Sequence, residues 1–170
     1  MFRTILAATD GSAPGTRATE AAADIAGRFG SRLLVLSVVP PGPLPRGITQ
    51  AAHGEAASAH PLLAKVPSWV DRARDQATRD TGESHAMLEE LARLALNHAV
   101  TLAERHAVAD CKTRVEHGDP AEIILDIAGG ENADLIVLGR RGLGGIRQLL
   151  TGSVTSKVMQ ASDRMCLTVK

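Results

Sequence analysis

Aromatic residues and net charge are both scarce in this chain of 170 residues. Only 2% of the residues are aromatic, with one Trp, two Phe and no Tyr, so no platform exists on which several nucleic-acid bases could stack. The formal net charge is zero, which argues against the large basic footprint of proteins that bind phosphate backbones. We therefore expect no nucleic-acid partner.

Cysteine is almost as rare, because the chain holds only Cys111 and Cys166. Two cysteines are too few for a disulfide framework. Each lies in an apolar, strand-like run, which favours two buried, reduced thiols over a redox pair or a metal site.

Long apolar runs are also missing. No window approaches the roughly 18 consecutive apolar residues that a membrane-spanning helix needs. The first stretch lacks a signal-peptide core, since Thr9 and Asp10 end its apolar run after a few residues. With 44% hydrophobic and 22% charged residues, the composition is typical of a globular protein. We expect a cytoplasmic protein without a membrane partner.

What the sequence does contain is a regular alternation of two kinds of segment. Apolar runs predict strands at residues 2–10, 31–40, 111–118, 134–139 and 164–170. Helical spacing of apolar and small residues predicts helices at 13–30, about 83–108, 119–133 and 152–162. This order predicts an α/β fold, an open five-stranded parallel sheet with helices on both faces.

One stretch interrupts the alternation. Residues 40–82 carry six of the eight prolines, which indicates a long loop or an inserted excursion. We expect a single domain over residues 1–170 with this Pro-rich insert. His53 and His60 lie in it without Cys or carboxylate at ligand spacing, so a metal site is not expected there.

Ligands of parallel sheets bind at the carboxyl ends of the strands, where the strand order reverses. The first strand ends at Thr9 and Asp10, and the fourth ends at Gly139, so the site is expected between them. His117 ends the third strand near this pocket, and a structural or solvent-facing role is expected for it. His98 and His106 are expected to be ordinary surface residues of the long helix.

The densest glycine stretch, "GRRGLGGIRQLLTGSV" at residues 139–154, joins the fourth strand to the last helix. A helix N-terminus presents unpaired backbone N–H groups, and its dipole favours anions. Ser153 and Thr155 add hydroxyl donors at this helix start. The spacing of the P-loop and the dinucleotide fingerprint are both absent. Composition alone leaves an ordinary Gly- and Arg-rich linker as the alternative.

The spacing of the glycines carries a resemblance. Gly139, two residues, Gly142, nine residues and then Gly152-Ser153 is similar to the nucleotide-binding pattern of the universal stress protein family. The runs "ILAATDGS", "LLVLSVV", "VEHGDPAEIILDIA" and "SVTSKVMQAS" also resemble that family. The resemblance covers nearly the whole chain except roughly residues 40–82.

The resemblance implies ATP as the ligand and assigns residues to it. The implied contacts are Ala8, Thr9 and Asp10 beside the nucleoside, backbone at Val38 against adenine, Gly139, Arg140, Arg141 and Gly142 along ribose and phosphates, and Gly152, Ser153, Val154 and Thr155 closing on the phosphates. Asp10 is either a helix cap or a site residue that accepts from ribose or holds Mg²⁺. Arg140 and Arg141 are either phosphate clamps or solvated loop residues.

No nucleophile–base constellation is visible in the sequence. The resemblance therefore favours an ATP-binding protein of stress response or regulation, with at most slow ATP hydrolysis. The alternative is a homologue that binds no nucleotide and serves as a protein-interaction module. The resemblance also implies a homodimer through the last strand. Met165 stands where the family commonly has proline, which bears on the geometry of that edge.

Overall fold

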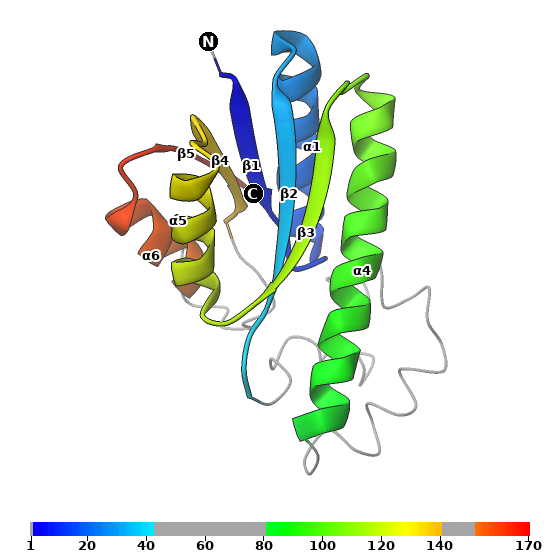
Figure 1. Ribbon diagram of the computed structural model, residues 1–170, viewed down its shortest axis with the longest axis vertical. Helices are drawn as coiled ribbons and strands as arrows, with labels where there is room; N and C mark the ends of the chain where they lie inside the picture. Colours follow the sequence, from blue (N-terminus) through cyan, green and yellow to red (C-terminus); the bar gives the residue numbers. More distant parts are fainter. Residues whose placement is uncertain (1, 43–80, 141–151) are drawn as a thin grey trace.

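The computed structural model describes residues 2–42, 81–140 and 152–170 (Figure 1). Strands and helices alternate as β1 (Thr4–Ala8), α1 (Ala13–Phe29), β2 (Arg32–Val39), α4 (Thr81–Arg105), β3 (Cys111–His117), α5 (Pro120–Gly130), β4 (Leu135–Gly139), α6 (Ser153–Ala161) and β5 (Met165–Val169). Most of the expected insert, residues 43–80, lies outside the described residues. The helix expected from about Glu83 begins slightly earlier, at Thr81.

The strands form one parallel sheet of five in the order β3-β2-β1-β4-β5. The chain runs outward from β1 through β2 to β3, and then returns to the other side of β1 for β4 and β5. Ala8 at the end of β1 is level with Leu36 of β2 and with Leu138 of β4. The predicted fold class is confirmed, and the strand order reverses between β1 and β4.

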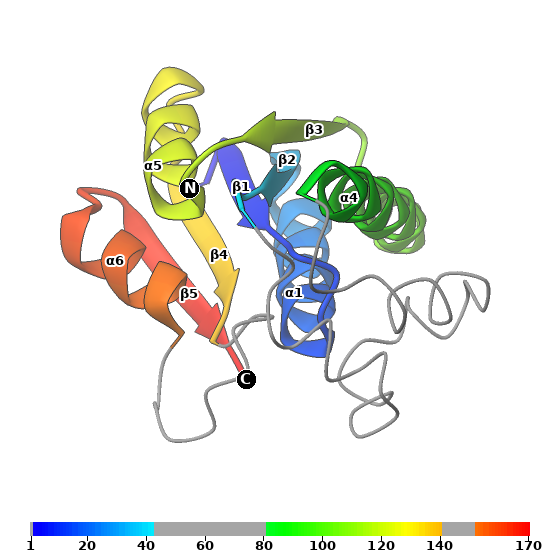
Figure 2. The same cartoon turned by 90° about the horizontal axis from the view of Figure 1, so that it is seen from below.

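Helices cover both faces of the sheet (Figure 2). Ile5 and Ala7 of β1 face α1 and α4, whereas Leu6 faces α5 and α6. All three of these side chains are fully buried. A strand that is buried on both faces must be apolar at successive positions, which explains the unbroken apolar runs in the sequence.

The α1–α4 layer depends on small side chains. Helical spacing in the sequence predicts one apolar stripe on the long helix, and the structure confirms it. Its members are buried except for the half-buried Met87; they are Met87, Leu88, Leu91, Ala95, Ala99, Leu102 and Ala103. A Cβ on Gly27 of α1 would lie 2.0 Å from the carbonyl oxygen of His106, just after α4. Glycine therefore permits the close approach of these two chain segments.

The two cysteines are free, but the expectation that both are buried is wrong. Cys111 and Cys166 are half-buried because they lie in β3 and β5, the two edge strands of the sheet. Partial burial, helped by the negative charges of Asp110 and Glu104, raises the pKa of the Cys111 thiol.

Among the described residues, no helix is both long and apolar enough to cross a membrane.

Candidate functional site

The turn after β1 is ordered by its own polar side chains. The Thr9 N–H donates to the Leu36 carbonyl at 2.9 Å, so pairing with β2 extends past the end of β1. Asp10 Oδ1 accepts from the Ser12 N–H at 3.0 Å and from the Ser12 hydroxyl at 2.5 Å. The Ser12 hydroxyl oxygen in turn accepts from the Gly15 N–H at 3.2 Å. Ser12 therefore caps α1, and Asp10 holds the capping residue in place.

The end of β4 packs directly against the start of α1. A Cβ on Gly139 would lie 2.8 Å from the carbonyl carbon of Pro14 and 2.9 Å from the Gly15 nitrogen. Thr155 of α6 donates its hydroxyl proton to the Gly139 carbonyl at 2.8 Å. The end of β4 and the starts of α1 and α6 therefore converge on Gly139, beside the Asp10 turn.

The two ends of the glycine-rich connection are joined to each other and to β5. The Arg140 N–H donates to the Val169 carbonyl at 2.6 Å, and the Gly152 N–H donates to the Arg140 carbonyl at 2.8 Å. Residues 141–151 lie between these joined ends and outside the described residues. The predictions for Arg141 and Gly142 fall in that segment.

Among the described residues, no side chain caps the N-terminus of α6. Gly152 occupies the cap position, and the first bond of the helix runs from the Ser156 N–H to the Gly152 carbonyl at 2.9 Å. The three preceding N–H groups, of Ser153, Val154 and Thr155, come before any intrahelical bond. The α1 and α5 helices differ, because Ser12 and Asp119 cap them. The start of α6 is thus suited to an anion.

The side chains at the start of α6 divide between surface and core. Ser153 is exposed, while Val154 packs against the core between the sheet and α5–α6. Thr155 is buried, and its hydroxyl proton is bonded to Gly139. Val154 is half-buried and apolar, so Ser153 alone of these three residues presents a polar side chain to solvent, and the backbone N–H groups dominate the chemistry of this terminus.

Ala8 and Val38 lie at the same edge, at the carboxyl ends of β1 and β2. Both are half-buried and pack on the α5–α6 side. Ala8 pairs with Leu36, so Val38 projects past the end of β1. Every predicted site residue that the structure describes is thus brought to one edge of the sheet.

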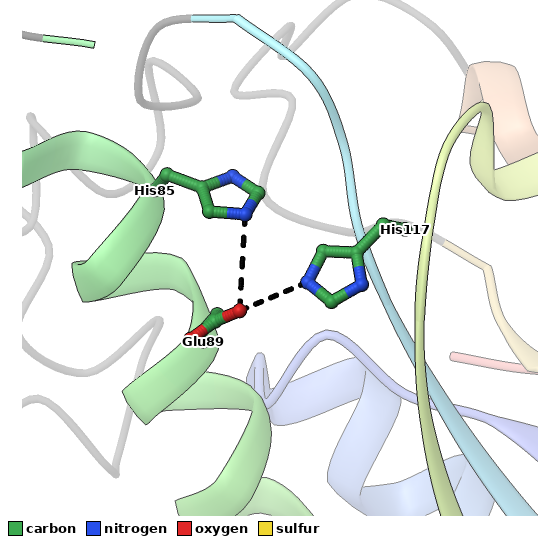
Figure 3. A group of neighbouring side chains, drawn as sticks. All are labelled: His85, Glu89 and His117. Atoms are coloured by element: carbon green, nitrogen blue, oxygen red, sulfur yellow. Dashed lines mark hydrogen bonds and ion pairs between the residues drawn. The ribbon is translucent and has the colours of Figure 1, made fainter. Parts of the chain in front are cut away.

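A second polar cluster lies further along this edge, at the end of β3 (Figure 3). Glu89 Oε1 lies 3.0 Å from His117 Nε2 and 3.8 Å from His85 Nε2. The two imidazole rings stack with centroids 5.1 Å apart. His117, expected to be structural or solvent-facing, has a side chain that is 49% exposed, and sequence reasoning missed its two partners. The His-x-x-x-Glu spacing on α4 was the available signal.

Comparison with known proteins gives independent information. The model of the universal stress protein family matches residues 1–170. The "Universal stress protein in QAH/OAS sulfhydrylase 3'region" of Thermus aquaticus is 32% identical over 170 residues, which covers 100% of both chains.

Solved structures show the same fold. A universal stress protein in complex with cAMP has a TM-score of 0.63 at 24% identity, covering 99% of this chain and 97% of that one. The universal stress protein from Archaeoglobus fulgidus in complex with dAMP has a TM-score of 0.59 at 19% identity, covering 100% of this chain and 98% of that one.

Proposed function

The chain belongs to the universal stress protein family, and from this premise we propose that it binds ATP at the sheet edge between β1 and β4. The observation that carries the proposal is the uncapped start of α6, where three backbone N–H groups precede the first intrahelical bond. Two proteins of the same fold, described above, were solved with the adenine nucleotides cAMP and dAMP.

The phosphates belong at the N-terminus of α6. The N–H groups of Ser153 and Val154 point in the direction of the helix dipole, which favours negative charge at this end. The terminus is held in position because Thr155 and Gly152 bond to the end of β4 at Gly139 and Arg140. Anchoring of this kind pre-organises the donors, so little ordering is needed when a phosphate binds.

The nucleoside belongs beside the turn after β1. Ala8 ends the central strand β1, and Thr9 and Asp10 follow it. Val38 lies near the end of the neighbouring strand β2, where its backbone would contact adenine. Asp10 is held by Ser12 and takes the role of ribose acceptor or Mg²⁺ ligand when nucleotide is bound. Bound Mg²⁺ would neutralise part of the phosphate charge.

The output is a change of conformation or of partner rather than rapid turnover. The sequence contains no nucleophile–base constellation, so ATP hydrolysis is slow at most. We place the protein in stress response or regulation on the strength of its family. If no nucleotide binds, the protein-interaction module becomes the better account.

We also propose a homodimer formed through β5. This strand is an edge of the sheet, and edge strands carry backbone groups that a second chain can pair with. Met165 is 61% exposed and Leu167 is 36% exposed on the same strand. Analytical ultracentrifugation of the wild type and of Leu167→Lys tests this, since a charge in the interface should favour the monomer. A wild-type monomer at every concentration contradicts it.

Isothermal titration calorimetry with ATP and Mg²⁺ tests the nucleotide site on the full chain. We expect one ATP per chain, with binding weakened at least about tenfold in Gly152→Val and Gly142→Val, because a Val side chain obstructs the close approach of phosphate to the backbone and so weakens its hydrogen bonds to the N–H groups. Gly129→Val is the matched control, since a Cβ at Gly129 meets nothing within 4 Å. The absence of binding at millimolar ATP, or binding that neither site variant weakens, would overturn the proposal.

A further inference from the structure

We propose that His85, Glu89 and His117 bind a zinc ion at the end of β3. The three side chains converge from two elements, with His85 and Glu89 on α4 and His117 on the strand (Figure 3). One potential ligand atom from each lies within 4.8 Å of the other two. This zinc site is separate from the proposed nucleotide site, and the two proposals are independent of each other.

The distances are close to those of a metal site before the metal binds. Tetrahedral zinc with bonds of about 2.0–2.2 Å holds its ligand atoms roughly 3.3 Å apart. Glu89 Oε1 already lies 3.0 Å from His117 Nε2 and 3.8 Å from His85 Nε2. Small side-chain rotations that draw the two nitrogens together would complete the three-ligand set.

The donor set selects a class of ion. Two imidazole nitrogens and one carboxylate oxygen suit Zn²⁺ and its transition-metal neighbours, whereas Mg²⁺ and Ca²⁺ prefer oxygen ligands alone. Three protein ligands leave one tetrahedral position for water or an anion. The side chains of His85 and His117 are 45% and 49% exposed, so an ion can reach them from solvent.

The backbone beneath the cluster is fixed by packing. His85 and Glu89 are four residues apart, which places them on one face of α4. On that helix Leu88 and Leu91 pack with Val39 of β2 in a separate apolar cluster. The strand that carries His117 pairs with β2 so that His117 is level with Val39. Ligands that rigid elements support need little reorganisation to bind a metal.

The molecule contains a natural comparison for this cluster. His106 Nδ1 lies 3.5 Å from Asp24 Oδ1, and within the described part of the chain no second histidine joins this pair. A His–Glu ion pair would explain the contacts of Glu89 without any metal, and it would behave like the His106 pair. The two explanations therefore predict different results. If the cluster is a metal site, zinc affinity depends on His85, Glu89 and His117 and not on His106; if it is an ion pair, none of these residues gives a specific zinc site.

The test is a zinc titration of the untagged full chain near neutral pH, in competition with a chromophoric chelator. We expect one Zn²⁺ per chain, with affinity lowered at least about tenfold in His85→Gln, Glu89→Gln and His117→Gln. Mutation of residues that only hydrogen-bond to metal ligands already lowers metal affinity about tenfold or more. The control His106→Gln should bind as the wild type does. Excess Mg²⁺ should not displace the zinc.

The visible absorption of bound Co²⁺ is a second measurement, and it would not change if the three residues served only to stabilise the fold. Co²⁺ in the wild type should show the visible absorption of a tetrahedral site, and His117→Gln should lose it while keeping its circular dichroism. Gly152→Val should retain zinc binding, which separates this site from the nucleotide site. Failure of the wild type to bind zinc, or binding that persists in all three cluster variants, would overturn the inference.

Discussion

Two connections leave the same edge of the sheet for helices on the same face, and they end differently. Between β3 and α5 the chain needs only Gly118, with φ of 143°, and Asp119. Asp119 accepts from the Ala121 N–H at 2.9 Å and the Glu122 N–H at 3.2 Å, and Pro120 follows it. Between β4 and α6 the connection is long, and Gly152 begins the helix without a side-chain cap.

The difference is the one expected between a connection that serves only the fold and one that, on the function proposed above, also serves a ligand. The first satisfies the start of its helix with its own carboxylate, so it leaves few donors for a bound molecule. The second presents backbone N–H groups and is held at both ends by hydrogen bonds to β4 and β5. Variants that exchange these properties test whether the contrast is functional.

The largest effect is expected at the close contact of the long connection. In Gly139→Ala the three atoms nearest to the new Cβ are backbone atoms of Pro14 and Gly15, at 2.8–2.9 Å. Since backbone cannot rotate away, we expect the free energy of unfolding to fall by about 1–3 kcal/mol. Urea denaturation measures this.

Gly129→Ala in α5 is the control for Gly139→Ala, because its Cβ lies in open space. We expect Gly129→Ala to be neutral or to stabilise by up to roughly 1 kcal/mol, as alanine favours helix. Equal destabilisation by the two variants would show that the β4 end is not under steric constraint.

The next effect concerns the hydrogen bond that holds α6 to β4. Thr155→Val removes the hydroxyl donor at 2.8 Å from the Gly139 carbonyl and leaves that acceptor in a partly buried position. We expect a loss of about 1–2 kcal/mol in the free energy of unfolding, whereas Thr155→Ser should restore most of it. Thermal denaturation compares the three proteins. A Thr155→Val protein as stable as the wild type would show that this hydrogen bond does not hold α6 to β4.

Much of the fold, and the difference between the two helix starts, could be predicted from the sequence because the signals are local. Strands buried on both faces must be apolar, so the run from Leu33 to Val39 reveals a central strand. The Asp119-Pro120 pair predicts a capped helix start, and the structure confirms it. Gly152 stands in the corresponding place before α6, and a glycine there predicts a helix start that its own cap residue cannot satisfy with a side chain.

The remainder depends on tertiary contacts that no local pattern contains. His85 and His117 are brought together only because α4 packs along β3, and the spacing of each in its own element does not specify the other. The same holds for Thr155, whose position predicts a phosphate donor although its hydroxyl proton bonds to Gly139. Side-chain partners distant in sequence are decided by packing rather than by propensity.

The cap of α5 gives a prediction with a pH dependence. Asp119→Ala should lower the free energy of unfolding by about 1 kcal/mol at neutral pH and leave ATP binding unchanged. Hydrogen bonds from the Glu122 and Ala121 N–H groups and the nearby Lys157 charge lower the pKa of Asp119, mainly through the Glu122 bond. Its stabilisation is therefore complete above the unfolded-state pKa of about 3.9. It is lost as pH falls through the lower folded value.

Asp119→Asn keeps a capping oxygen without the titration. Between neutral pH and strongly acidic conditions, the wild type should lose more stability than Asp119→Asn, as measured by denaturation at a series of pH values. Parallel pH profiles of the two proteins would contradict the assignment of this carboxylate as an ionised cap.

The smallest change in stability, and the sharpest test of the comparison, comes from giving α6 the cap of α5. The backbone of Gly152 has φ of −66° and ψ of 153°, which any residue adopts at a cap position. In Gly152→Asp the carboxylate should accept from the N–H groups that start α6 and raise the free energy of unfolding by a few tenths of a kcal/mol. The same carboxylate occupies the proposed phosphate position and repels it, so ATP affinity should fall at least about tenfold.

Gly152→Asn separates capping from charge. It should stabilise α6 similarly and should weaken ATP less than Gly152→Asp does, because it competes for the N–H groups without repelling phosphate. Calorimetry and denaturation on the same samples provide both numbers. If Gly152→Asp stabilises the fold yet binds ATP as the wild type does, the start of α6 accepts a cap but holds no phosphate. The contrast between the two connections would then be one of length and capping, without a bound phosphate.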